Sequence, residues 1–430
     1  MLEASQGQTV MMLVFAFTVA ALVTEKYHRV VSALLGAALA VYFGGFVYHI
    51  FSPEEAVSTF IDGPTMRLIL GVLLLMEGLA RSGLFQFIGL WIVRLVRGNV
   101  RLLFTAFMFM STGLTLVIPN LPAMLIIGAI TASVARQAPI RLRKWILYEA
   151  VACNAGSIGL MISSIPNLIV AAEFGFSFAD FVSTTAPLAL LLAAVTTAIG
   201  LWTGGLTRDG ECHVGVDVDP WRAVKSVWSL LRSGVIFVAF IALLALSDRA
   251  NVPMDIVALM GGVAMLWLGA AEPEDILRSL DWGTFFFLAG FYVLVGAEER
   301  AGVLDLLARQ VAPIYGLPWP LSSTITLWVA GLASGIVDNI PITLTLIPIV
   351  EKAAAAGGSS APLMAWALAI GANLGGSLTY FASPPSLIAV SILEREEPGF
   401  TPWEFVKVGA PMTLLHLAVA NVYLLLRLGA

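Results

Sequence analysis

Long runs of apolar residues, separated by short polar loops, make up most of this chain. A membrane-spanning helix needs about 20 mostly apolar residues, so the pattern has room for roughly ten spans. The first apolar run, residues 9–23, follows the acidic Glu3 and lacks the basic start and the cleavage site of a secretory signal. We therefore predict that this run is the first membrane helix of an all-α polytopic membrane protein.

One apolar segment, residues 102–136, is interrupted at its centre by Pro119 and Pro122. Two prolines three residues apart remove backbone donors and break a helix. Each arm then has about 15 residues and spans roughly 22 Å, less than the ~30 Å apolar core of a bilayer. The pattern predicts a re-entrant helical hairpin, and residues 318–351 repeat it with a tip at residues 337–341.

A second pair of apolar segments carries Gly, Ser, Asn and Pro where a span would otherwise be continuous. The interruptions lie at residues 154–157 and 163–167 in the first segment and at residues 373–377 and 382–386 in the second. Backbone that is unwound inside a membrane must be buried in protein or line a wet cavity. We predict two broken transmembrane helices whose ends aim their dipoles at a central site, although a packed kink is the structural alternative for each break.

The two halves of the chain match at a constant offset, since Asp62 recurs 219 residues later as Asp281. The same offset relates Arg81 to Arg300, Gly83 to Gly302, Asn120 to Asn339, Pro122 to Pro341, Asn154 to Asn373, Gly156 to Gly375, Ser164 to Ser383 and Pro166 to Pro385. The matched residues are of types that are rare in apolar segments, which argues against chance. Duplicated halves are typical of secondary transporters.

Positive charge is distributed unequally between the two copies. Residues 94–144 hold seven Lys and Arg residues, whereas the equivalent residues 313–363 hold only Lys352. Short loops rich in Lys and Arg stay in the cytoplasm, so the two windows are predicted to face opposite sides of the membrane. The halves are therefore predicted to be inverted-topology repeats, joined by a cytoplasmic loop at residues 207–232.

Composition supports lipid as the main solvent of this chain. Hydrophobic residues make up 59% and charged residues 12%, against about 25% charged in soluble domains. The net charge of −5 gives no basis for a nucleic-acid partner, and the two cysteines, Cys153 and Cys212, form no disulfide framework. Neither a metal-ligand cluster nor a nucleophile–base pair stands out, so we predict no enzyme, no metal and no cofactor beyond H⁺ or Na⁺ as coupling ion.

Asp338 is the main candidate for a coupling group. An acid at the bilayer centre costs about 2.5–3.5 kcal/mol, and no basic residue lies near Asp338 in the sequence. We predict that it holds a proton or binds a cation, with a helix-capping role as the alternative. The first tip has Pro119 at the equivalent place. Glu149 is the second candidate for proton coupling, and a surface carboxylate beside Arg143 and Lys144 is its alternative.

The polar residues of the tips and the breaks form the predicted substrate- and ion-binding set. Amide and hydroxyl oxygens and freed carbonyls can ligate a cation or a small polar solute, or else satisfy backbone groups at the breaks. The set comprises Asn120, Asn154, Gly156, Ser157, Ser164, Asn167, Asp338, Asn339, Asn373, Gly375, Ser377, Thr379 and Ser383. Cys153 is interpreted as a packing residue, and Glu77 and Arg81, one turn apart, as an ion pair.

These motifs resemble the ion transporter superfamily, specifically the arsenite-permease and NhaD-type sodium/proton antiporter group, and more distantly the divalent anion/sodium symporters. The second copy carries the resemblance most clearly, with the tip Asp338-Asn339 followed by the breaks at residues 373–376 and 383–386. The first copy is less similar, with Pro119-Asn120 at its tip. The resemblance covers residues 30–427, nearly the whole chain.

The resemblance implies a homodimer in which each subunit has a scaffold domain and a transport domain that moves as an elevator. The implied divisions are residues 1–101 (scaffold), 102–205 (transport, first hairpin and first broken span), 206–317 (cytoplasmic linker and scaffold) and 318–430 (transport, second hairpin and second broken span). Family cation sites use the tip asparagines, which are Asn120 and Asn339 here, and carbonyls near Asn154 and Asn373.

The sequence therefore predicts a multi-pass protein of the cell inner membrane that exports a small inorganic solute, an arsenite-like oxyacid, coupled to H⁺ or Na⁺. A neutral oxyacid fits a site of amides, hydroxyls and carbonyls without an arginine. A Na⁺/H⁺ antiporter and a sodium-coupled di- or tricarboxylate symporter are the alternatives within this class. A channel or a non-transporting membrane platform is the alternative outside it, but hairpins that enter from opposite sides favour alternating access.

Overall fold

The computed structural model describes residues 2–24, 26–96, 99–207, 219–223, 226–269, 271–358 and 360–428. Its secondary structure in these ranges is helical, apart from isolated bridge residues such as the pair Ile140 and Thr207. Eight of the described helices are long and apolar enough to cross a membrane, or nine if one bent pair counts as a span. The expected all-α polytopic membrane fold is confirmed.

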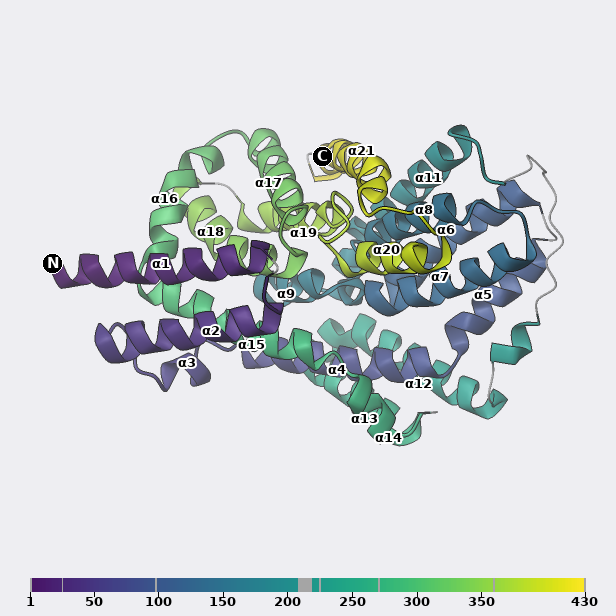
Figure 1. Ribbon diagram of the computed structural model, residues 1–430. Coiled ribbons are helices and arrows are strands. Elements are labelled where there is room, and N and C mark those ends of the chain that lie inside the picture. The colour runs from purple at the N-terminus through teal and green to yellow at the C-terminus, as the bar shows by residue number, and fades with distance from the viewer. Residues whose placement is uncertain are drawn as a thin grey trace.

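The first half of the chain runs from the N-terminal helix to the helix before residue 207 (Figure 1). Its helices are α1 (Leu2–Thr24), α2 (Arg29–Ala40) continued by the π-helix η1 (Val41–Val47), α3 (Glu55–Ser58), α4 (Gly63–Arg81), α5 (Leu84–Leu95), α6 (Val100–Val117), α7 (Asn120–Gln137), α8 (Leu142–Gly156), the 3₁₀ turn η2 (Met161–Ser163), α9 (Ile165–Phe174), α10 (Phe178–Thr184) and α11 (Ala186–Trp202).

The second half repeats this order. Its helices are the 3₁₀ turn η3 (Pro220–Ala223), α12 (Val227–Ala250), α13 (Met254–Leu268), α14 (Pro273–Ser279), α15 (Trp282–Arg300), α16 (Val303–Tyr315), α17 (Trp319–Ser334), α18 (Asn339–Gly357), α19 (Ala361–Gly375), α20 (Pro384–Glu396) and α21 (Trp403–Leu428). Because α12 begins at residue 227, the loop predicted at residues 207–232 is shorter than expected. Part of that loop, including Cys212, lies outside the described residues.

Six helices of the second half begin 219 residues after a helix of the first half. The paired starting positions are 63 and 282, 84 and 303, 100 and 319, 120 and 339, 142 and 361, and 165 and 384. The repeated sequence positions are therefore positions at which helices begin and end.

Local chemistry explains several of these repeats. Asp62 caps α4 by accepting a hydrogen bond from the Thr65 amide, and Asp281 caps α15 in the same way through the Thr284 amide. A carboxylate at the N-cap satisfies amide groups that have no partner within the helix. The turn that follows each of these helices needs a left-handed residue, which glycine adopts without strain: φ is 80° at Gly83 and 73° at Gly302.

The helices pack in a pattern that is also duplicated. Helix α4 packs along α13, and its counterpart α15 packs along α2. Helix α7 contacts α20, and its counterpart α18 contacts α9, so each broken span of one half lies against the hairpin of the other. Figure 1 shows the first hairpin, α6–α7, and the second hairpin, α17–α18, on opposite sides of the centre of the molecule, with α9 and α19 between them.

The hairpin breaks lie where they were predicted, but the arms are longer than expected. The first tip separates α6 from α7, with 18 residues each, and the second separates the 16-residue α17 from the 19-residue α18. An arm of 18 residues spans about 27 Å, so the expected length of about 15 residues is wrong. The apolar pattern misled because the helices continue past the flanking polar residues, as α6 does when it begins at residue 100.

Candidate functional site

A cavity of about 330 Å³ lies where the two hairpin tips meet. The first tip contributes Pro119 and Asn120, and the second contributes Asp338 and Asn339. Although these tips are more than 200 residues apart in the chain, they line one space. The tips and the breaks were predicted to form one central site, and this cavity brings both tips together with residues of both breaks.

Six helices begin at the wall of this tip cavity. The residues that line it include the first turns of α2, α7, α9, α15, α18 and α20, represented by Arg29, Asn120, Ile165, Thr284, Asn339 and Pro384. A helix N-terminus carries a partial positive charge and unpaired amide groups, so it favours an anion. The hairpin and break geometry therefore directs the N-termini of six helices at one cavity.

Prolines limit the number of amide donors at these N-termini. The third residue is Pro122 in α7 and Pro341 in α18, while α9 has Pro166 as its second residue and α20 begins with Pro384 and Pro385. Proline is tolerated in the first turn of a helix, where its missing amide loses no intrahelical bond. The four helices thus keep their dipoles but offer few amide groups to a solute.

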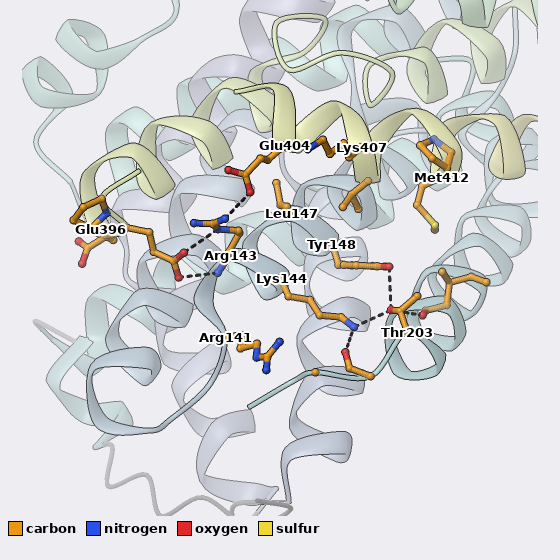
Figure 2. Close-up of a pocket in the computed structure, with 17 residues that line it drawn as sticks. Arg141, Arg143, Lys144, Leu147, Tyr148, Thr203, Glu396, Glu404, Lys407 and Met412 are labelled. Carbon is orange, nitrogen blue, oxygen red and sulfur yellow. Dashed lines mark hydrogen bonds and ion pairs between the residues drawn. The ribbon is translucent and has the colours of Figure 1, made fainter. Parts of the chain in front are cut away.

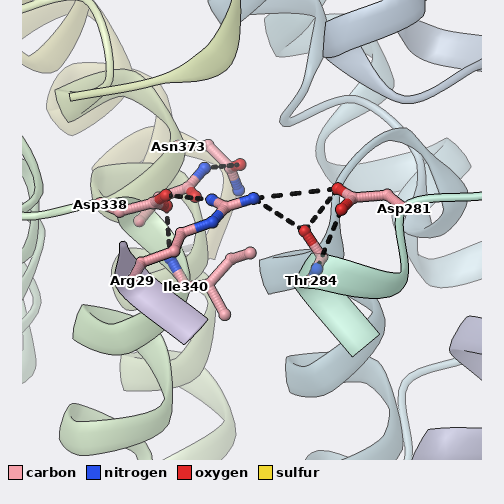
Figure 3. Close-up of polar contacts among 7 residues, drawn as sticks. Arg29, Asp281, Thr284, Asp338, Ile340 and Asn373 are labelled. Atoms are coloured by element: carbon pink, nitrogen blue, oxygen red, sulfur yellow. Dashed lines mark hydrogen bonds and ion pairs between the residues drawn. The ribbon is translucent and has the colours of Figure 1, made fainter. Parts of the chain in front are cut away.

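Asp338 is ion-paired in the structure, although no basic residue lies near it in the sequence. Figure 3 shows Arg29 reaching from α2 between Asp338 on one side and the start of α15 on the other. Its Nη1 lies 2.8 Å from Asp338 Oδ2, and its Nη2 donates to Thr284 Oγ1 at 2.9 Å. Asp338 also caps α18 by accepting a bond from the Ile340 amide at 3.2 Å. The capping alternative is thus confirmed as a structural role.

Arg29 lines the tip cavity and was missed by sequence analysis, so the expected absence of arginine from the site is wrong. It stands 309 positions before Asp338, so no local spacing could indicate their contact. The available signal was a charged residue at the start of an apolar segment, Arg29–Val47, that is long enough to span a membrane. Such a residue is a functional candidate by default.

Most of the other predicted polar residues bind each other directly beneath the tips. The Asn373 side chain donates to Asn167 Oδ1 at 2.9 Å, and Asn167 donates to the carbonyls of Ser157 and Leu160. The Asn339 amide approaches Asn373 Oδ1 at 3.4 Å. Both broken spans and the second tip are therefore joined by one buried network.

The equivalent asparagine of the first half makes a second link. Asn154 donates to Ser377 Oγ at 2.8 Å and to Ser383 Oγ at 3.0 Å. The Ser383 hydroxyl in turn donates to the Gly376 carbonyl. Asn154 Oδ1 is buried and has no hydrogen-bond partner. This oxygen differs from Asn373 Oδ1 and Asn167 Oδ1, which both accept hydrogen bonds within the network.

Four further candidates have packing, capping or backbone-bonding roles. Gly156 lies against α6, where a side-chain carbon would come within 2.6 Å of the Thr112 carbonyl, and Gly375 lies against α17, where it would come within 2.1 Å of the Gly331 carbonyl. Ser164 lines the cavity and caps α9. Thr379 donates to the Gly335 carbonyl at 2.7 Å, away from the cavity.

Glu149 lies in α8, away from the tip cavity, and its side chain is buried. Its side chain is 0% exposed, so the alternative of a surface carboxylate is wrong. Thr131 of α7 donates to Oε1 at 2.6 Å, and Oε2 has no partner. Cys153, one turn further, is buried with its sulfur 4.0 Å from Met124 Sδ, as expected of a packing residue.

A cavity of about 380 Å³ beside Arg81, Arg232 and Glu272 is also larger than the tip cavity. Two further cavities that contain charged residues are larger still, and none of the three includes a hairpin tip. One, of about 1010 Å³, lies between α8, α11, α20 and α21. Figure 2 shows that Arg143 there is held by glutamates of the α20–α21 region, with Glu404 at 2.5 Å, and that Lys144 bonds to Thr203 at 2.8 Å. The other, of about 560 Å³, lies between α4, α9, α15 and α18. We assign the site to the smaller tip cavity because the symmetric breaks converge there.

The helical fold and the cavity between its two hairpin tips define a polytopic membrane transporter. A family model described as the citrate transporter, CitMHS, matches residues 19–371, and the chain belongs to that family. The resemblance to the ion transporter superfamily is thereby supported at the level of the CitMHS family, while the narrower arsenite-permease and NhaD-type group stays a prediction.

Individual proteins agree with this assignment. A 46 kDa membrane protein of Mycobacterium leprae is 29% identical over 96% of this chain and 97% of its own length. An uncharacterized transporter of Mycobacterium tuberculosis is 27% identical over 96% of this chain and 97% of its own length. The crystal structure of the Alcanivorax borkumensis YdaH transporter superposes with a TM-score of 0.63 at 15% identity over 87% of both chains, which shows a shared fold.

Proposed function

We propose that this protein is a secondary active transporter that moves a small anion across the membrane, coupled to H⁺ or Na⁺. The observation that carries the proposal is the convergence of six helix N-termini and the Arg29 guanidinium on one cavity of about 330 Å³. Helix N-termini favour anions, and arginine binds carboxylates in a bidentate geometry. The citrate transporter description of the family supports a carboxylate as the anionic group.

Arg29 changes the preference among the solutes that the sequence left open. Export of a neutral, arsenite-like oxyacid was expected because the site was thought to lack an arginine. With Arg29 in the cavity wall, that reason no longer holds. We therefore place a cation-coupled carboxylate transporter first, and keep the oxyacid exporter and the Na⁺/H⁺ antiporter as outcomes that the same experiment can reveal.

We further propose that the hairpins and broken spans move together against the remaining helices. Residues 102–205 and 318–430 would form the transport domain, and residues 1–101 and 206–317 the scaffold and linker of a homodimer in the inner membrane. In support, α6 packs on α8 and α17 on α19 within the first group, while α4 packs on α13 and α2 on α15 within the second. The shared polar network of Asn154, Asn167 and Asn373 would hold the moving part together.

Inverted repeats are the structural basis of this movement in our proposal. Hairpins that lie on opposite sides of the centre of the molecule, as in Figure 1, are what two repeats of opposite orientation would produce. Alternating access then follows if the cavity opens first past one hairpin and then past the other.

Transport by the full chain in proteoliposomes tests the proposal. Radiolabelled citrate, succinate, arsenite and ²²Na⁺ are supplied in turn under an imposed pH gradient and an imposed Na⁺ gradient. We expect uptake of citrate or succinate several-fold above protein-free liposomes, and only with a cation gradient. The exposed pair Glu274 and Arg278 provides matched controls, since Glu274→Gln and Arg278→Gln leave the cavity untouched. Movement of arsenite alone, or of Na⁺ alone, would assign the alternative functions.

A further inference from the structure

We propose that Arg29 and Asp338 are the coupling device of the transporter: the anionic group of the solute replaces Asp338 on Arg29, while Asp338 takes up one monovalent cation, H⁺ or Na⁺. This inference rests on the proposed function, because it requires that the tip cavity accepts an anion. It deepens that function by naming the group that recognises the anion and the reason that a cation must bind with it.

Arg29 is positioned to exchange one anionic partner for another. Of the two terminal nitrogens of its guanidinium, Nη1 donates to Asp338 at 2.8 Å and Nη2 donates to Thr284 Oγ1 at 2.9 Å. The side chains of Arg29 and Asp338 are 33% and 25% exposed, and both line the cavity. A solute inside the cavity can therefore reach the ion pair without unfolding of either tip.

Arg29 would keep its place when Asp338 leaves it. Arg29 begins α2, which packs along α15, and Thr284 stands in the first turn of α15. The Thr284 hydroxyl donates to Asp281 Oδ2 at 2.5 Å and accepts from Arg29, so Asp281 fixes the acceptor that orients the guanidinium. Asp281 itself lies 3.8 Å from Arg29 Nη2. A preoriented guanidinium binds a carboxylate with less loss of side-chain entropy.

Asp338 has no second counter-charge among the described residues that line the cavity. Helices α7, α9 and α20 contribute the uncharged Asn120, Ser164 and Pro384. The remaining charged residues in the wall are acids: Asp281, and Glu77, which is paired with Arg81 at 2.7 Å. When an anion takes Arg29, the Asp338 carboxylate therefore needs a cation from solution.

The exchange conserves charge. In the observed state, Arg29 and Asp338 sum to zero. After exchange, Arg29 is neutralised by the solute carboxylate and Asp338 by H⁺ or Na⁺, so the pair of sites again sums to zero. An anion that entered alone would leave an unpaired carboxylate inside the membrane, which is unfavourable. One cation is thus required for each carboxylate held by Arg29. At these two residues, the carboxylate and the cation bind together without a change in net charge, as expected for symport.

Equilibrium binding of radiolabelled citrate and succinate to the purified, detergent-solubilised full chain tests the inference. For the wild type, we expect affinity about tenfold higher at pH 6.5 than at pH 8.5, or about tenfold higher with Na⁺ than with choline at pH 8.5, within the usual range of coupling between sites. The first result assigns the proton and the second assigns Na⁺. Asp338→Asn should bind at least as tightly as the wild type at its best, with no dependence on Na⁺.

Citrate and succinate also change protonation between pH 6.5 and pH 8.5, and the Asp338→Asn variant measures how much this alone changes the affinity. The coupling is therefore the ratio of affinities at the two pH values in the wild type, divided by the same ratio in the variant. Arg29→Gln should lower affinity at least tenfold under all conditions, and Arg29→Lys should fall between Arg29→Gln and the wild type. Gel filtration of each variant checks folding, and Glu274→Gln and Arg278→Gln are the controls.

The inference and the proposed function fail in different ways. If the wild type binds neither citrate nor succinate, the anion-transport proposal is wrong and the inference with it. If the wild type binds an anion but Asp338→Asn keeps the same cation dependence, or Arg29→Gln keeps the same affinity, only the coupling role of this ion pair is overturned.

Discussion

The two hairpin tips share one backbone geometry but have different electrostatic environments. The residue before α7 is Pro119, with φ −53° and ψ 146°, and the residue before α18 is Asp338, with φ −49° and ψ 144°. Both following helices begin with Asn and have Pro as their third residue. Only the second tip is held by a charge from another helix, that of Arg29. The two copies thus share how the chain turns, while the ion-paired charge lies in one copy.

The largest effect is expected where the two halves are most alike, at the glycines that end α8 and α19. An alanine side chain at Gly375 would lie 2.1 Å from the Gly331 carbonyl, and one at Gly156 would lie 2.6 Å from the Thr112 carbonyl. Backbone cannot yield as a flexible side chain can, so Gly375→Ala and Gly156→Ala should each cost about 3 kcal/mol or more. Thermal melting in detergent measures the loss.

Gly113 provides a matched control for these substitutions, since an added side-chain carbon there meets no atom within 4 Å. Gly113→Ala should melt at or slightly above the wild-type temperature, because alanine favours a helix by up to about 1 kcal/mol. A Gly375→Ala variant that melts like Gly113→Ala would contradict the close packing of broken span and hairpin.

The paired asparagines beneath the tips should differ in importance. Asn373→Ala removes the donor to Asn167 Oδ1 and leaves that buried oxygen without its bond, at a cost of about 2–3 kcal/mol. Asn154→Ala should cost only about 1 kcal/mol, because Ser383 keeps its bond to the Gly376 carbonyl and Asn154 Oδ1 has no partner to lose. Equal losses of melting temperature in the two variants would show that the network is symmetric after all.

Double-mutant cycles can compare the second tip, where Asp338 pairs with Arg29, with the first tip, where Pro119 takes the equivalent position. The Arg29–Asp338 pair is about one-third exposed, so its coupling energy should be about 1 kcal/mol in a cycle of Arg29→Met and Asp338→Asn. The same cycle with Pro119→Ala in place of Asp338→Asn should give about zero, because no bond joins Pro119 to Arg29. A coupling of similar size at both tips would remove the electrostatic difference between them.

The smallest effects on stability are expected at Arg81 and Arg300, the matching arginines that end α4 and α15. Arg81 pairs with Glu77 at 2.7 Å, whereas its counterpart Arg300 pairs with Glu55 at 3.0 Å. Both pairs reach solvent, so Arg81→Gln and Arg300→Gln should each cost about 0.5 kcal/mol or less. The cost should shrink further when melting is repeated in high salt, since salt screens exposed pairs. A loss above 1 kcal/mol in either variant would mark its ion pair as part of the buried structure.

Sequence reasoning located the elements of this fold because the repeated residues act on the local backbone, where they start helices or form turns. Asp62 and Asp281 start helices, and Gly83 and Gly302 end turns, so their recurrence reported secondary structure directly. The tips and breaks were found for the same reason, since proline interrupts a helix wherever it stands.

What sequence reasoning missed depends on contacts between distant elements. The Arg29–Asp338 bond joins residues 309 positions apart, and the Asn373–Asn167 bond joins residues 206 apart. The burial of Glu149 was also left open by the sequence, because its basic neighbours favoured a surface carboxylate as the alternative, whereas its side chain is buried in the structure. Such outcomes are decided by packing, and a single sequence does not encode packing in any short pattern.

The prolines in the first turns of α7, α9, α18 and α20 have a consequence for how tightly a solute can be held. A phosphate loop binds its ligand through many backbone amides, whereas in this cavity prolines replace some of the amides of the first helical turns. What remains is an electric field with few directional contacts. Such a chamber would attract negative charge, tolerate differences in solute shape and release its cargo readily, which suits a carrier that must let go on every cycle.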